Sequence, residues 1–134
     1  MKNILPLSLL ALTLFAAQPA LAVLPQKLAS VNELESDARN FSLMIGEGQE
    51  CALKIQRFDG GIRLGMISEE GLTWLDVRND SAVVLTQSYQ DDGSYVREYE
   101  IPGQGKLTAL TADDSYFHAS LEANGKKVNC ELDF

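Results

Sequence analysis

The chain has few of the residues on which enzymes most often rely for acid–base and nucleophilic chemistry. Its 134 residues include one histidine, His118, and two cysteines. The G-x-S-x-G and H-E-x-x-H motifs and the phosphate-binding glycine loop are absent. His118 occupies a polar position in an alternating stretch, which indicates a solvated surface side chain. We therefore expect no enzyme activity, no catalytic residue, no cofactor and no metal site.

Long apolar runs are confined to the first 22 residues. Lys2 precedes an apolar run over residues 4–17, and Ala20-Leu21-Ala22 gives a small-x-small pattern. This layout predicts a signal peptide over residues 1–22, cleaved after Ala22. The run is too short for a stable spanning helix, which needs about 20 residues. An uncleaved anchor is the alternative. We expect a periplasmic or secreted protein that leaves the membrane after cleavage.

Positive charge is scarce. The sequence has 11 Lys+Arg against 19 Asp+Glu, and loss of Lys2 with the signal leaves a formal charge of −9. Repulsion argues against nucleic acid and against anionic membrane surfaces as partners. A partner that is attracted by charge is expected to be a cationic protein. The sequence does not indicate the oligomeric state.

Helical periodicity is limited to one stretch after the predicted cleavage site. Ser30, followed three residues later by Glu33, is typical of a capping box. Apolar residues then recur at helical spacing: Leu28, Val31, Leu34 and Ala38. We expect a short helix over residues 31–40, within an N-terminal arm over residues 23–40. From Phe41 the apolar period becomes two, and residues 41–134 are predicted to form one β domain.

Short alternating runs fill the remainder of the chain and are separated by turn residues. Asp92-Gly93 and Asn124-Gly125 are typical of type I′ hairpins. We count about nine strands, the first beginning near Phe41. Their regular spacing predicts an all-β fold, a small antiparallel up-and-down barrel or sandwich of about 8–9 strands with a short N-terminal helix.

The two cysteines, Cys51 and Cys130, occupy apolar positions of an early predicted strand and the last one. In an exported chain they are expected to form a disulfide. Closing a loop of about 80 residues stabilises the fold by roughly 4–5 kcal/mol in the chain-entropy model. Two free thiols or a metal pair are the weaker alternative, because two cysteines and one histidine do not complete the four ligands of a zinc site.

The predicted turns differ in charge according to the end of the meander on which they fall. Alternate turns of an up-and-down meander share an end. One end, here called the predicted acidic pole, collects eight carboxylates: Glu47, Glu50, Glu69, Glu70, Asp91, Asp92, Asp113 and Asp114. Ser94 and Tyr95 are expected beside them as contact residues. The other end is flanked by Arg57, Arg63, Arg78, Lys106, Lys126 and Lys127. One hypothesis is that the predicted acidic pole binds a cationic protein or divalent cations. The alternative is that these residues belong to ordinary solvated turns without a function.

Two stretches resemble the bacterial periplasmic C-type lysozyme inhibitors: Glu50-Cys51-Ala52-Leu53-Lys54-Ile55 and Val128-Asn129-Cys130-Glu131-Leu132. The resemblance implies a small disulfide-closed β-barrel and agrees with binding to a cationic enzyme. That family inserts a loop with the pattern Ser-Gly-x-x-Tyr into its target. This sequence lacks the pattern, and Gly93-Ser94-Tyr95 differs from it in order. No functional residue is therefore transferred from the family.

The leading hypothesis is a non-catalytic exported protein that recognises a cationic protein partner, as an inhibitor of a lysozyme-type enzyme or of a toxin. One alternative is a lipocalin-like barrel that holds a small apolar ligand, because eight or so strands can enclose one small molecule. Another is a structural protein of the cell envelope without a ligand.

Overall fold

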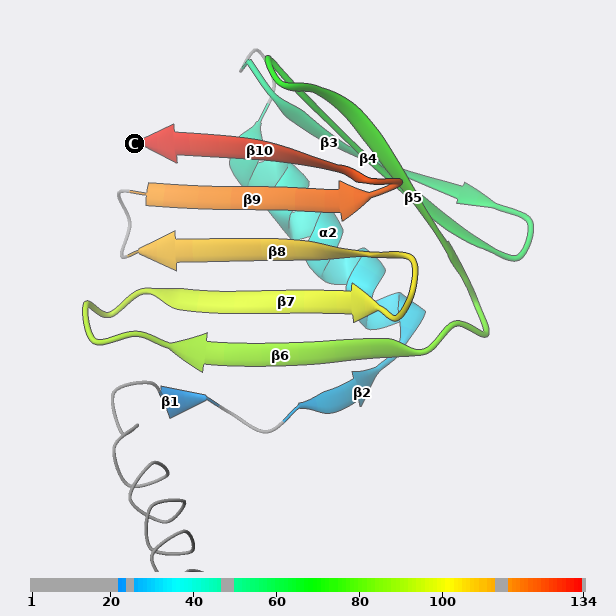
Figure 1. The fold of residues 1–134 in the computed structure, drawn as a ribbon, viewed down its shortest axis with the longest axis horizontal. Coiled ribbons are helices and arrows are strands. Elements are labelled where there is room, and N and C mark those ends of the chain that lie inside the picture. The colour runs from blue at the N-terminus through cyan, green and yellow to red at the C-terminus, as the bar shows by residue number, and fades with distance from the viewer. Residues whose placement is uncertain (1–21, 24–25, 47–49, 113–115, 134) are drawn as a thin grey trace, which may run out of the picture.

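The structure is a computed structural model that describes residues 22–23, 26–46, 50–112 and 116–133. These residues form one α-helix, α2 (Val31–Ile45), and two antiparallel sheets (Figure 1). The three-stranded sheet has the order β3 (Ala52–Phe58), β4 (Gly61–Ser68) and β5 (Gly71–Arg78). The seven-stranded sheet contains β1 (Ala22–Val23), β2 (Lys27–Ala29), β6 (Val83–Tyr89), β7 (Tyr95–Ile101), β8 (Gly105–Ala112), β9 (Tyr116–Ala123) and β10 (Lys126–Asp133).

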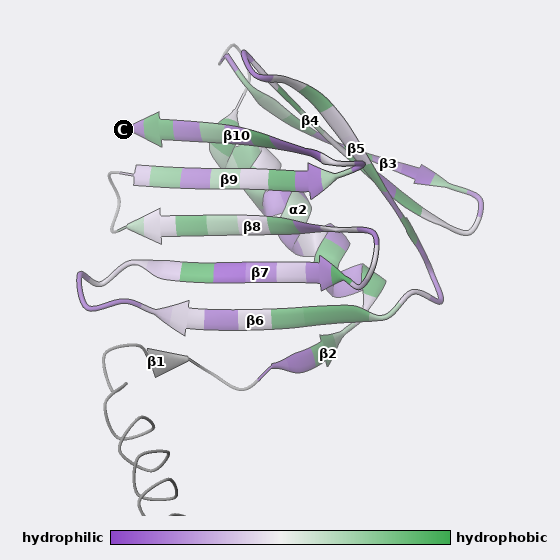
Figure 2. Cartoon of the chain, in the orientation of Figure 1, coloured by the Kyte–Doolittle hydropathy of each residue, from purple (hydrophilic) through white to green (hydrophobic). Residues whose placement is uncertain are grey.

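The all-β prediction is confirmed, and the alternating pattern of the sequence explains it. Figure 2 shows hydrophobic and hydrophilic residues alternating along β7 to β10. In β9, for example, Phe117, Ala119 and Leu121 are fully buried, whereas His118 and Glu122 face the other side. Successive side chains of a strand point to opposite faces, so this alternation gives the sheet one buried face.

Helix α2 is longer than predicted. Ser30 caps it as expected, since its hydroxyl accepts a hydrogen bond from the Glu33 N–H at 3.0 Å. The helix continues through Phe41 to Ile45, so the prediction of a strand beginning near Phe41 is wrong. Phe41 and Ile45 are buried. They follow Ala38 by three and seven residues, a spacing that places them on the same helix face as Leu34 and Ala38. That continuity favours helix over strand.

The helix belongs to the core rather than to a separate arm. It lies across one face of the seven-stranded sheet, and the three-stranded sheet crosses the β9–β10 side (Figure 1). The rings of Phe41 on α2 and Phe117 on β9 are 5.9 Å apart. On the other sheet, the Ser42 hydroxyl donates to the Leu53 carbonyl oxygen at 2.9 Å. The helix therefore joins the inner faces of both sheets.

The inner rows of the two sheets form a packed core. Leu64, Met66, Tyr99 and Phe117 all have an exposed fraction of 0%. These rows are the ones that would line the cavity of a lipocalin-like barrel. Because they pack against one another and against α2, the structure provides no support for the small-ligand alternative.

The predicted Cys51–Cys130 disulfide is confirmed, with the two Cα atoms 5.8 Å apart. It links the start of β3 to β10. Nearby, the Thr73 hydroxyl donates to the Ala123 carbonyl oxygen at 2.8 Å, and Asn124 Nδ2 donates to the Trp74 carbonyl oxygen at 2.9 Å. Over the described residues no strand ladder joins the two sheets, so these side chains connect them. Of the two predicted forms, the two-sheet one describes the fold.

The N-terminal strands cover the outer edge of β6. Ala22 pairs with Tyr89 and Val23 with Ser88, so strand pairing begins at the predicted cleavage junction. The predicted signal segment before Ala22 lies outside the described residues. Within the described part of the chain, no helix combines the length and the apolar character needed to cross a bilayer.

Candidate functional site

A surface groove with a volume of about 460 Å³ lies beside the disulfide. The β4–β5 turn forms one wall, and neighbouring positions of β9 and β10 form the other. Four carboxylate residues line it: Glu50, Glu69, Glu70 and Glu131. We call this feature the acidic groove.

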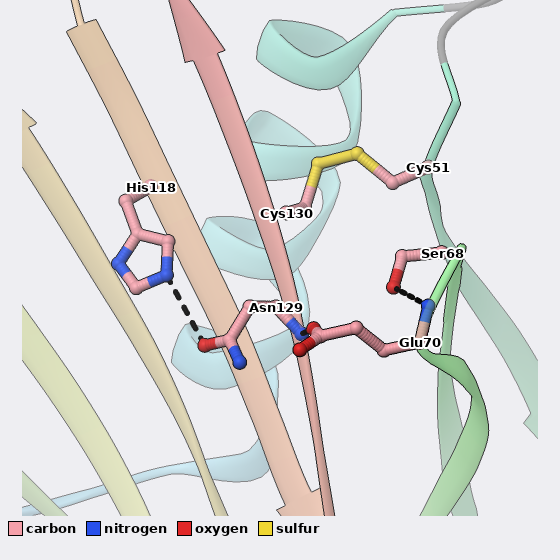
Figure 3. The surroundings of a disulfide bond; sticks show 6 residues. All are labelled: Cys51, Ser68, Glu70, His118, Asn129 and Cys130. Carbon is pink, nitrogen blue, oxygen red and sulfur yellow. Dashed lines mark hydrogen bonds between the residues drawn. A yellow bond between two sulfur atoms is a disulfide. The ribbon is translucent and has the colours of Figure 1, made fainter.

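Backbone and side-chain hydrogen bonds hold the groove in place (Figure 3). Oε1 of Glu70 accepts from the backbone N–H of Asn129 at 2.8 Å, which attaches the β4–β5 turn to β10. The Glu70 N–H in turn donates to the Ser68 hydroxyl at 3.1 Å. On the far side, Nε2 of His118 lies 3.2 Å from Oδ1 of Asn129. Glu70 therefore has a structural role in addition to its charge.

Glu50 and Glu69 both line this groove. A side-chain hydrogen bond to Glu50, followed by repulsion between the two charges, raises the pKa of Glu69 above its usual value. Two like charges at one site favour the protonated form of one of them. The lining of the groove contains no lysine or arginine to offset this repulsion. The lining residues thus present negative charge to solvent, and a nearby cation is Lys126, whose Nζ lies beside Gly71 at the end of the β4–β5 turn.

Such a groove can bind the ammonium or guanidinium groups of a cationic protein, because these groups relieve the repulsion and form charge-assisted hydrogen bonds. A divalent cation is the other ligand that the sequence raised. In the part of the chain that the structure describes, no group of three or more His, Cys, Asp or Glu side chains has an arrangement that could hold a metal ion.

The predicted acidic pole consists of two separate groups over the described residues. Glu50, Glu69 and Glu70 meet in the acidic groove. Asp91 and Asp92 belong to the β6–β7 turn, which Figure 1 shows well away from the β4–β5 turn. Since β7 is three strands from β10, the separation across the sheet is about 14 Å. The other predicted members, Glu47, Asp113 and Asp114, lie outside the described residues.

The β6–β7 turn also differs from the predicted type I′ hairpin. The Gly93 N–H donates to the Gln90 carbonyl oxygen at 2.9 Å, and Gly93, with φ of 86°, is the residue of this turn with positive φ. A type I turn followed by a glycine in the left-handed region fits this geometry. The type I′ prediction holds instead for Asn124 and Gly125, whose φ angles are 56° and 74°.

Ser94 and Tyr95, the predicted contact residues, both form hydrogen bonds within the protein. Ser94 is 2% exposed, and both its N–H and its hydroxyl donate to Oδ1 of Asp92, at 2.9 and 2.7 Å. These bonds lower the pKa of Asp92. The Tyr95 hydroxyl donates to Oε1 of Gln87 at 2.6 Å, and its ring packs on Tyr89. Both side chains thus form contacts within the protein, and their role as contact residues for a partner stays a prediction.

Three of the six basic residues at the predicted basic end form ion pairs within the fold. Arg57 pairs with Glu35, Arg63 with Asp76, and Lys106 with Glu98, at 2.8, 2.6 and 3.6 Å. Arg78, Lys126 and Lys127 are exposed.

Sequence reasoning missed Glu131, Asn129 and His118 as parts of the groove. All three stand at polar positions within strands, and only turn residues had been considered for the acidic surface. The pairing of Glu131 with His118 depends on the register of β10 against β9. The polar alternation of both strands marks these residues as outward-facing, but it does not show which of them are neighbours.

Comparison of the chain with protein-family models, with curated proteins and with solved structures found no match.

Proposed function

We propose that this chain is a non-catalytic exported protein that binds a cationic protein through the acidic groove, and that it acts as an inhibitor of a lysozyme-type enzyme or toxin. One observation supports the proposal above all. Four carboxylate residues line a groove whose lining contains no lysine or arginine, and Glu50 raises the pKa of Glu69 there. A fold gains nothing in stability from such repulsion, whereas a binding surface for cations gains affinity and association rate.

Export is part of the proposal and rests on two observations. The sequence begins with the charged, apolar and small-residue pattern of a signal peptide. The Cys51–Cys130 disulfide fits an oxidising compartment, where such bonds persist. The resemblance of the strands around the two cysteines to lysozyme inhibitors points in the same direction and stays a prediction.

Calorimetry against a C-type lysozyme tests the binding proposal. Glu69→Lys and Glu131→Lys each place a cation in the groove without touching the bond between Glu70 and Asn129. We expect each to weaken binding by at least about tenfold, and we expect wild-type affinity to fall with added salt, as for charge pairs near a surface.

Asp91→Lys is the matched control. It makes the same change of charge on an exposed residue of the distant β6–β7 turn, so the expected affinity is close to that of the wild type. Equal losses for Asp91→Lys and Glu69→Lys would mean that net charge matters and the groove does not. Failure to bind lysozymes and other cationic enzymes would remove the proposal itself.

A further inference from the structure

A second groove, with a volume of about 470 Å³, lies where β5 passes the β7–β8 and β9–β10 turns. Its lining includes Trp74, Asp76, Gln104 and Asn124, together with two turn glycines. It shares no lining residue with the acidic groove. Its size falls within the range of about 300–1,000 Å³ that is usual for small-molecule sites.

Trp74, the one tryptophan of the sequence, is held flat against the three-stranded sheet. A Cβ atom added to Gly65 would lie 2.5 Å from Cζ3 and 2.6 Å from Cε3 of the indole. The missing side chain of Gly65 therefore makes room for one face of the ring. Trp74 is still 39% exposed, which is high for the largest apolar side chain. The sheet thus displays an aromatic surface that the core does not use.

An ion pair fixes the polar groups next to this ring. Arg63 donates from Nε to Oδ1 and from the terminal nitrogen to Oδ2 of Asp76, at 2.6 and 3.0 Å. The same guanidinium lies over the Trp74 ring, with Cζ 5.6 Å from the ring centre, and so covers part of the indole. A bidentate pair of this kind is geometrically specific. It holds the Asp76 carboxylate in place while its remaining lone pairs stay available for a ligand.

Two amide side chains complete the groove. Asn124 Nδ2 donates to the Trp74 carbonyl oxygen at 2.9 Å, and this bond sets the orientation of the amide. Gln104 is exposed on the β7–β8 turn. Amides both donate and accept hydrogen bonds, as a ligand rich in hydroxyl groups requires.

The charge balance of this groove separates it from the acidic groove. Asp76 is neutralised by Arg63, and the other named lining residues are uncharged. An uncharged ligand with many hydroxyl groups fits these features: the apolar C–H face of a sugar packs on an indole, while its hydroxyls bond to carboxylate and amide groups. We propose that this groove binds an uncharged oligosaccharide of pyranose units, with Trp74 as its stacking surface.

Titration of the protein with β-1,4-linked tetramers of glucose and of N-acetylglucosamine tests this proposal. Trp74 is the sole tryptophan, so the intrinsic tryptophan fluorescence reports on the site directly. We expect a saturable change in fluorescence with at least one of the two tetrasaccharides. If neither produces a saturable change up to about 10 mM, the proposal is overturned.

Two variants then locate the site without removing the reporter. Gln104→Ala shortens an exposed side chain. Asn124→Gly removes the amide side chain, and glycine tolerates the positive φ that Asn124 adopts in this turn. Loss of a hydrogen bond to a ligand is expected to weaken binding by about tenfold in each. Unchanged affinity in both would show that the sugar binds elsewhere and would overturn the proposal.

Glu69→Lys is the control that keeps the two binding proposals apart. It changes the acidic groove and is expected to leave sugar affinity unchanged, because the grooves share no residue. Conversely, Gln104→Ala is expected to leave binding to a cationic protein unchanged. A parallel loss of sugar binding in Glu69→Lys and Gln104→Ala would count against a separate sugar site.

Discussion

The guanidinium of Arg57 on β3 donates from Nε to Oε2 of Glu35 on α2, with 2.8 Å between the two atoms. Arg39, one turn along the helix, donates to the same oxygen at 2.7 and 3.0 Å. The Glu35 side chain is 6% exposed, whereas that of Arg57 is 73% exposed. A nearly buried carboxylate thus fastens the helix to the edge strand of the three-stranded sheet.

Replacing Glu35 with glutamine is expected to lower the free energy of unfolding at pH 7 by about 1 kcal/mol, a modest loss because solvent screens both exposed guanidinium groups. The bonds from Arg57 and then Arg39 lower the pKa of Glu35 in the folded chain. Its stabilising contribution is therefore complete at neutral pH and is lost as pH falls through the folded-state pKa. Urea unfolding at pH 7 and pH 3 measures both effects.

Glu33→Gln is the control for the Glu35 variant. Glu33 is on the same helix, but its side chain is 48% exposed and lies 3.5 Å from Lys27. We expect little change in stability at either pH. If Glu35→Gln is as stable as Glu33→Gln at pH 7, the Glu35–Arg57 contact does not hold the helix.

Replacing both cysteines with alanine is expected to cost up to about 4–5 kcal/mol of unfolding free energy, because the bond closes a loop that spans 79 residues in sequence. Denaturant unfolding with and without a reducing agent measures this loss. The reducing agent should destabilise the wild type and leave the double variant unchanged. If the unfolding free energy of the wild type is the same with and without the reducing agent, after full unfolding and refolding, the expected role of the bond is contradicted.

Glu50→Gln is expected to stabilise the protein at neutral pH. Glu50 raises the pKa of Glu69 in the folded chain, so the folded state loses stability as pH rises from the unfolded-state pKa of Glu69 through the folded-state value. Removing the charge of Glu50 removes that loss. The stability of the variant should exceed that of the wild type at pH 7 and match it at pH 3. A pH titration of Glu69 followed by NMR should show its pKa falling in the variant.

Asp92→Ala is expected to destabilise the β6–β7 turn, because buried Ser94 loses the acceptor of its N–H and its hydroxyl. The midpoint of urea unfolding should fall. Asp91→Ala removes the neighbouring exposed carboxylate and should leave the midpoint unchanged. Equal midpoints for the two variants would show that the Asp92–Ser94 bonds contribute nothing.

Local patterns in the sequence account for much of the fold. Ser30 and Glu33 predict where the helix begins, and Asn124-Gly125 predicts the hairpin before β10. Both depend on neighbours in sequence. The end of the helix was missed because Phe41 and Ile45 are four residues apart, which fits both a helical period and a two-residue strand period over so short a stretch. The packing of Phe41 against Phe117 decides in favour of the helix.

The acidic groove was only partly predictable for a related reason. The turn parity correctly associated Glu50 with Glu69 and Glu70, which meet in the structure. The same count of alternate turns could not separate these glutamates from Asp91. It tells at which end of the strands a turn lies, but not to which sheet the strands belong or how far apart two turns are across a sheet. Glu131 joins the groove through the crossing of the two sheets, which depends on the packing of the whole core.

The disulfide divides the molecule into two levels of stability. Strands β3 to β9 and the first part of β10, up to Cys130, lie within the covalent loop from Cys51 to Cys130. Helix α2 lies outside this loop and is attached by packing and by bonds such as Ser42 to Leu53. Because α2 is held by noncovalent contacts alone, we expect its amides to exchange with solvent faster than those of the central strands, although its apolar face belongs to the core. The central strands should exchange only when the whole domain unfolds. Oxidation of the cysteines thus protects the sheets that carry both grooves more than it protects the helix beneath them.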